Sequence, residues 1–172
     1  MKSPLIIAAL IAIITAPLQA DWQDEVTSRQ PDPSFLTIRP VHLSFQINWN
    51  GKINSGHLNM LFGREDDRYP SHFITQIYGA STGLARSLYP YDYSFTSFLK
   101  YDSYLPSMFT SLETTSKGRT DTSNWYGPTV RSRETFTPSR GGSGSKKKNS
   151  TFSFRKAPIY DFASALIYLR RL

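Results

Sequence analysis

The sequence predicts a mainly β protein: an antiparallel curved sheet or partial barrel with a C-terminal helix packed against it. Three features predict this class: an alternating strand that ends at Asn50-Gly51, a series of short aromatic or β-branched segments separated by Gly, Pro or Ser, and a largely apolar segment at the end. Regularly spaced short strands with turn residues between them are typical of antiparallel sheets and barrels. A chain of 172 residues holds at most one ordinary domain, which we place at residues 39–172.

The first predicted strand and its turn lie at residues 41–51. Apolar and polar residues alternate strictly in VHLSFQINWN, which indicates a strand with one solvated face. Asn50 ends this run and Gly51 follows it, and the pair favours a type I′ turn, in which both central residues need positive φ. With these two residues as the whole loop, Phe45 pairs with Gly56 and the apolar side chains of both strands share one face.

Further short elements are predicted along the chain. HFITQIYGA is typical of a third strand that is apolar on both faces, and ASTGLARSLYP is typical of a short helical turn or connector. Four more segments predict strands: DYSFTSFLKYDSY, SMFTSLETTSKG, WYGPTVRSRETFTP and STFSFR. The Gly, Ser and Lys content of residues 140–150 predicts a flexible basic loop rather than a domain linker.

The last segment, residues 158–171, predicts a helix, in which Asp161 acts as the N-cap or as an acid in the first turn. Its apolar side chains form an arc wider than half the circumference of the helix. So wide an arc needs cover on more than one side, and the curved sheet supplies only one of them. We therefore expect a second source of cover for this helix.

The first residues have the pattern of a secretory signal peptide. Residues 1–20 combine one basic residue, an apolar run too short to span a bilayer, and small residues before a cleavage site that we place after Ala20. An uncleaved N-terminal anchor is the alternative. Residues 21–38 are polar, contain prolines and form a lead-in. The chain has no cysteine, which excludes a disulfide framework. Export without cysteine fits a bacterial periplasm more easily than a small secreted animal domain, which would normally need disulfides.

The net charge of +7 indicates an attraction to anionic lipid, cell-wall polymer or nucleic acid. Export makes nucleic acid an unexpected partner, whereas peripheral contact with a membrane stays open. The candidate anion-binding residues are Arg131, Arg133, Lys146, Lys147 and Lys148. The two arginines share a strand face, and the lysines of the predicted loop extend their patch. The alternative interpretation is a solvated loop that keeps the protein soluble.

Aromatic residues crowd one segment of the sequence, between residues 89 and 104. Some of these rings must pack in the core, whereas a surplus on one face of the sheet suits an apolar ligand or a partner protein. The candidate ligand-binding residues are Tyr91, Phe95, Phe98 and Tyr101. Packing of all the rings in the core is the alternative interpretation.

No constellation of residues predicts catalysis. His42 and His57 share the solvated face of the predicted hairpin and lie diagonal to each other, so they could hold a metal. No cysteine or HExxH motif supports that site, and two solvated histidines are the favoured interpretation. GGSGS lies outside the strand-to-helix context of a GxSxG nucleophile, and GSGSKKK lacks the phosphate-loop pattern. We therefore expect no catalytic residue, no metal and no cofactor.

Four segments resemble, in order along the chain, the bacterial exported family called domain of unknown function 3108 (DUF3108): VHLSFQINWNGKINSGHL, GASTGLARSLYPYD, LPSMF and IYDFASALIYLR. The resemblance spans residues 40–170 and implies a signal-bearing protein with a mostly antiparallel β-fold. It implies no catalytic residue and no cofactor. Family members continue with further strands after the segment similar to SALIYLR, whereas this sequence ends at Leu172.

The resemblance therefore implies that the C-terminal strands are lacking, and that a dimer, a second protein or a lipid surface supplies the missing cover. A shortened gene product of low stability is the alternative. The sequence as a whole predicts an exported envelope protein that binds an apolar or lipid-like ligand or a partner protein without catalysis. The alternative function is binding of an anionic cell-surface polymer or lipid through the basic loop.

Overall fold

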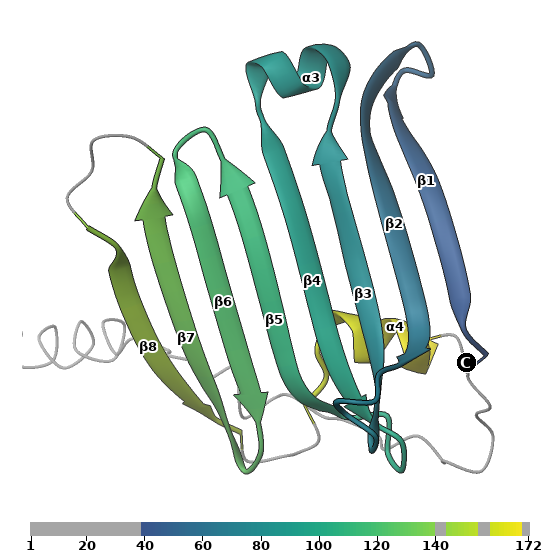
Figure 1. Ribbon diagram of the computed structural model, residues 1–172, viewed down its shortest axis with the longest axis vertical. Coiled ribbons are helices and arrows are strands. Elements are labelled where there is room, and N and C mark those ends of the chain that lie inside the picture. Colours follow the sequence, from purple (N-terminus) through teal and green to yellow (C-terminus); the bar gives the residue numbers. More distant parts are fainter. Residues whose placement is uncertain (1–38, 140–143, 155–158, 170–172) are drawn as a thin grey trace, which may run out of the picture.

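A computed structural model describes residues 39–139, 144–154 and 159–169 (Figure 1). Eight antiparallel strands form one sheet in the order β1 to β8, so each strand pairs with its neighbours in the sequence. The strands are β1 Val41–Trp49, β2 Ile53–Glu65, β3 His72–Ser81, β4 Tyr91–Lys100, β5 Pro106–Thr115, β6 Gly118–Tyr126, β7 Thr129–Pro138 and β8 Lys146–Ser153. The predicted class, a mainly β protein with a curved antiparallel sheet and a C-terminal helix, is confirmed.

Two helices of the described residues accompany the sheet, at opposite ends of its strands (Figure 1). α3 (Gly83–Leu88) connects β3 to β4 where a helical turn was expected, and α4 (Phe162–Leu169) lies inside the predicted helix 158–171. Within the described ranges no helix is long and apolar enough to cross a membrane. The predicted signal peptide and lead-in, residues 1–38, lie outside the described residues.

The turn between β1 and β2 has the predicted chemistry. Asn50 and Gly51 have φ values of 51° and 68°, and the backbone N–H of Lys52 donates to the carbonyl of Trp49 at 3.1 Å. Positive φ at both central residues is the requirement of a type I′ turn, which explains why Asn-Gly stands here.

The predicted register of this hairpin is wrong by two residues. Phe45 faces Leu58 instead of Gly56, because β2 carries an extra residue after the turn and another opposite the step from Ile47 to Asn48. Side chains alternate between faces with a period of two, so the two-residue shift keeps the partners of Val41 to Ile47 on their predicted face, whereas the one-residue shift beside the turn moves Ile53 to the face of Trp49.

Strand β6 was not predicted, because its sequence, GRTDTSNWY, is mostly polar. It pairs with β5 on one side and with β7 on the other, so it is a central strand of the sheet. Its Thr, Ser and Asn side chains are partly exposed rather than buried. Hydrogen bonding to both neighbours therefore forms this strand without an apolar face.

The prediction of a flexible loop over residues 140–150 is wrong from Lys146 onward. Residues 140–143 lie outside the described residues, and β8 begins at Lys146 and pairs along β7. Glu134 of β7 lies opposite Lys148, which places opposite charges across the strand pair. The lysine run therefore belongs to an edge strand of the sheet rather than to a loop.

The core lies between α4 and the end of the sheet where β3 begins and β4 ends (Figure 1). Its buried residues are Phe73 of β3, Leu99 of β4, Ile167 of α4 and Tyr104, and Phe62 of β2 packs against them. Leu99 is fully buried. The eight residues of α4 thus cover only one part of one sheet face.

A buried carboxylate joins α4 to the sheet. Ser97 of β4 donates its hydroxyl to Oδ2 of Asp161 at 2.6 Å. The backbone N–H of Ser164 donates to Oδ1 of Asp161 at 2.8 Å, and the N–H of Asp161 donates to the Ser164 hydroxyl oxygen at 2.8 Å. Asp161 is therefore the N-cap of α4, which is the first of the two roles predicted for it. Through Ser97 it also attaches the helix to β4.

Replacing Asp161 with Ala should lower the free energy of unfolding by about 1–3 kcal/mol, because the change removes the cap and leaves the buried Ser97 hydroxyl without its acceptor. Urea unfolding of the variant and of the parent protein measures this difference. Asp67→Ala is the matched control, because Asp67 is an exposed acid. An equal effect of both substitutions would contradict the anchoring role.

Candidate binding surfaces of the sheet

Alternation along β4 separates the two faces of the sheet. Ser97 contacts the N-cap of α4, so Phe95, Tyr93 and Tyr91, at every second position, lie on that same face. We call this face the helix-bearing face and the other the opposite face. α4 covers the Ser97 end of β4, and the tyrosine end extends beyond it toward α3 (Figure 1).

A ladder of aromatic rings follows β4 on the uncovered part of the helix-bearing face. The ring centroids of Tyr91 and Tyr93 are 5.5 Å apart, those of Tyr93 and Phe95 are 5.2 Å apart, and those of Phe95 and Phe109 of β5 are 6.0 Å apart. These separations are typical of favourable ring pairs. We call these four residues the aromatic ladder.

A glycine makes room for the middle of the ladder. Gly79 of β3 lies opposite Tyr93, and a Cβ atom built on Gly79 would stand 2.7 Å from the Tyr93 hydroxyl and 2.9 Å from its Cζ atom. The ring therefore leans across the backbone of β3. Close approach of this kind is a common reason for glycine inside a strand.

The exposed apolar side chains of β1 continue this surface. Leu43, Phe45, Ile47 and Trp49 share the helix-bearing face and are between 40% and 69% exposed. Leu58 and Met60 of β2 lie between them and the ladder in the strand pairing. We define the apolar face by these residues and the aromatic ladder: Leu43, Phe45, Ile47, Trp49, Leu58, Met60, Tyr91, Tyr93, Phe95 and Phe109.

A carboxylate, that of Glu113, borders the apolar face at the α3 end of the ladder. The Tyr91 hydroxyl donates to Oε2 of Glu113 at 2.7 Å. Burial of the ring, and then the bonded carboxylate, raise the pKa of Tyr91 far above its ordinary value. Burial also raises the pKa of Tyr93. Both rings therefore stay neutral at physiological pH, and the apolar face itself carries no charge.

The four predicted ligand-binding aromatics do not form one surface. Tyr91 and Phe95 lie on the apolar face, but Phe98 is buried on the opposite face, with its ring centroid 4.6 Å from that of Tyr69. Tyr101 lies in the turn after β4, with its ring centroid 5.5 Å from that of Phe73. Side chains alternate between the two faces along β4, so Tyr91 and Phe95, at odd positions, share one face, and Phe98, at an even position, lies on the other.

The two ladder residues that the prediction omitted are Tyr93 and Phe109. Strand alternation alone identifies Tyr93, because it stands two positions from both Tyr91 and Phe95. Phe109 comes from another strand, opposite Ser97, and only the register between β4 and β5 brings its ring to Phe95.

The opposite face carries a basic hollow at β6 to β8. Trp125, Arg131, Ser132, Arg133, Asn149, Ser150 and Thr151 line this hollow of about 310 Å³. The guanidinium carbon of Arg133 lies 5.7 Å from the centroid of the Trp125 ring, within range of a cation–π interaction. Among the described residues, neither Arg131 nor Arg133 forms an ion pair with a carboxylate.

The sheet divides the predicted cluster of anion-binding residues between its two faces. Arg131 and Arg133 share one strand face, which is the opposite face of the sheet, and Lys147 lies on this face as well, paired with Thr135. Lys146 and Lys148 point to the helix-bearing face, because residues alternate along β8. The structure therefore groups Arg131, Arg133 and Lys147 and separates the other two lysines from them.

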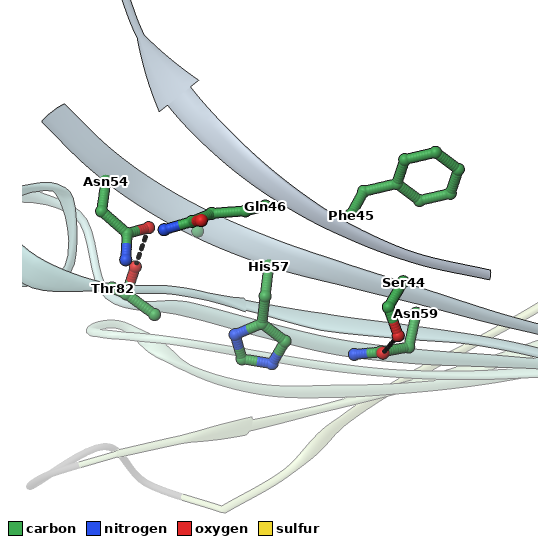
Figure 2. Close-up of a pocket in the computed structure, with 8 residues that line it drawn as sticks. Ser44, Phe45, Gln46, Asn54, His57, Asn59 and Thr82 are labelled. Atoms are coloured by element: carbon green, nitrogen blue, oxygen red, sulfur yellow. Dashed lines mark hydrogen bonds between the residues drawn. The ribbon is translucent and has the colours of Figure 1, made fainter. Parts of the chain in front are cut away.

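A second hollow, of about 450 Å³, lies over β1 and β2 on the opposite face, with Phe45 directed away from it (Figure 2). Its polar lining contains no Asp, Glu, Lys or Arg and consists of Ser44, Gln46, Asn54, His57, Asn59 and Thr82. The Ser44 hydroxyl donates to Asn59 at 2.6 Å, and the Thr82 hydroxyl donates to Asn54 at 3.0 Å. Several polar groups of this hollow therefore already bond to one another.

The observed register also separates the two histidines that were considered for a metal. His57 lies opposite Gln46, whereas His42 lies opposite Leu61, four positions away along β2. Among the described residues, no group of three or more His, Cys, Asp or Glu side chains is arranged to hold a metal ion. The favoured interpretation, two solvated histidines, agrees with their exposure.

Comparison with models of known protein families, with curated proteins and with solved structures finds no match to this chain. The resemblance to the DUF3108 family, the signal peptide and the export therefore stay predictions. The candidate surfaces rest on the geometry of the chain alone.

Replacing Gly79 with Ala should lower the free energy of unfolding by about 1–3 kcal/mol, because the new methyl group meets the ring of Tyr93 and the backbone of β2. Urea unfolding measures the loss, and near-UV circular dichroism reports the displaced tyrosine. Gly127→Ala is the control, because its Cβ position has no neighbour closer than 3.8 Å. A neutral effect of Gly79→Ala would contradict the close packing of Tyr93.

Proposed function

We propose that the protein is a non-enzymatic, exported envelope protein that binds an apolar, lipid-like molecule on its apolar face. One observation carries the proposal: β1, β2, β4 and β5 present exposed or partly exposed apolar and aromatic side chains on one face, on both sides of β3, and the described helix α4 covers only the far end of that face. Large exposed apolar patches are typical of binding sites in soluble proteins.

The chemistry of the face favours an acyl chain or a similar ligand. All ten defining side chains are uncharged, and the β3 residues between them, Ile77 and Gly79, are uncharged as well. A stack of neutral rings offers dispersion contacts and apolar area but few hydrogen bonds. Each methylene group removed from water on such a surface contributes about 0.8 kcal/mol to binding.

The β1 side of the face supplies most of its accessible area. Phe45 is 48% exposed and Trp49 is 69% exposed, whereas the ladder rings are only partly exposed. A ligand therefore buries most of its contact area over β1 and β2, and its side contacts the rings of the aromatic ladder. α4 closes the other end of the site, because it packs on Leu99 and Phe73.

Replacing Phe45 with Ser should weaken binding of a fatty acid with a fluorescent acyl chain about tenfold, because the ring is a large exposed part of the apolar face. Fluorescence titration of the folded protein measures the Kd. Gln46→Ser is the matched control, because it changes the next residue of the same exposed strand on the opposite face.

Binding that is absent in the parent protein, or that weakens equally in both variants, would contradict the proposal. Absence of fatty-acid binding together with Phe45-dependent capture of a purified partner protein would favour the second predicted kind of occupant, a protein, over a lipid-like ligand.

We infer a second candidate function, binding of an anionic polymer, from the basic hollow on the opposite face. Arg131 and Arg133 have no carboxylate partner among the described residues, and Trp125 positions the Arg133 guanidinium. Lys147 adds a third positive charge to that face. Unpaired guanidinium groups bind carboxylates and phosphates through paired N–H donors. This hollow replaces the predicted basic loop as the candidate anion site.

Replacing Arg131 and Arg133 together with Ala should weaken binding of polygalacturonate at low salt at least about tenfold, and added salt should weaken the binding of the parent protein. Isothermal titration measures both effects. Lys146→Ala with Lys148→Ala is the charge-matched control, because these lysines point to the other face. Equal losses in the two double variants would indicate attraction by net charge alone and contradict a site at the hollow.

A further inference from the structure

The two edges of the sheet differ in their protection against pairing with another strand. β8 begins with three consecutive lysines, Lys146 to Lys148, which hinder the approach of a second strand. β1 is nine residues long, is exposed over most of its length and contains no charged residue. An uncharged edge strand of this length offers its free backbone N–H and C=O groups to another chain.

The sequence of β1 is also complementary to itself. An antiparallel pairing of two β1 strands centred on Phe45 sets Leu43 opposite Ile47 and Val41 opposite Trp49. On the other face, the polar residues between them pair in the same way. Each apolar side chain thus meets an apolar one and each polar side chain a polar one, as a two-fold interface requires.

We propose that two copies of this chain associate through antiparallel pairing of their β1 strands, centred on Phe45. The two sheets then form one continuous sheet, and the apolar faces of the two copies become adjacent. A register shifted by one residue would set apolar side chains against polar ones, so the alternation of β1 selects among registers.

The chemistry of the edges also selects the symmetry of the assembly. Pairing of β8 with β8 would bring the lysine-bearing strands of two copies together. Pairing of β1 with β8 would leave one edge free at each end and continue into an open-ended assembly. Pairing of β1 with β1 avoids the repulsion and leaves only the lysine-protected edges outside. The association therefore stops at a dimer.

The chain has no cysteine, so single cysteines introduced on β1 report the register directly. Phe45→Cys should form a covalent dimer under mild oxidation, because the two Cα atoms would be about 4.5–5.5 Å apart, within the range of a disulfide. Ser44→Cys and Gln46→Cys should each stay monomeric in non-reducing mass spectra, but an equal mixture of the two should form a mixed disulfide. A covalent dimer of Ser44→Cys alone would contradict this register.

Sedimentation of the cysteine-free protein tests the association without a cross-link. We expect a dimer, and we expect Gln46→Lys to raise its dissociation constant at least about tenfold, because the variant places two new charges in the interface. Ser153→Lys on β8 is the matched edge control and should leave the dimer intact. A parent protein that stays monomeric throughout the micromolar range, or one whose mass grows without limit, would overturn the proposal. Neither test depends on the ligand of the apolar face.

Discussion

The structure depends on how one short helix is placed on a wide single sheet. α4 has eight residues and the sheet has eight strands, so the helix covers only a small part of one face. The bond between Ser97 and the Asp161 carboxylate decides which part is covered. It sets α4 over Phe73 and Leu99, the most deeply buried apolar residues of β3 and β4. In the described part of the chain, many apolar side chains on the rest of that face are exposed or partly exposed.

The two halves of the sheet, β1 to β4 and β5 to β8, differ in the side chains that they present where α4 does not cover them. β5 to β8 are rich in Thr, Ser and charged residues, so water can solvate both of their faces, and only a few rings interrupt this pattern. β1 to β4 keep apolar side chains on the helix-bearing face far beyond the reach of α4. Exposing these side chains costs solvation free energy, and burial against the proposed ligand would recover it. The basic hollow over β6 to β8 and the apolar face over β1 to β5 therefore lie on different faces of the sheet.

Much of the fold follows from the sequence, and the failures have physical causes. Alternation and the Asn50-Gly51 turn predict β1 and its faces, but a bulge near Ile47 has no sequence signature and changes the register. β6 escapes prediction because backbone pairing alone supports a polar strand between two neighbours. For the candidate site, the alternation of side chains along a strand is enough to place Tyr91 and Phe95 on one face and Phe98 on the other. Phe109 can be assigned to the aromatic ladder only when the register between β4 and β5 is known.

The central claim is that the uncovered part of the helix-bearing face takes up an apolar ligand. An acyl chain that carries a nitroxide label, added to the isotope-labelled protein, tests this most directly through the line widths of its NMR spectrum. The account predicts strong broadening for Leu43, Ile47 and Leu58, and little for Ser44 and Asn59 on the opposite face. Equal broadening on both faces, or broadening confined to the exposed leucines of α3, would contradict it.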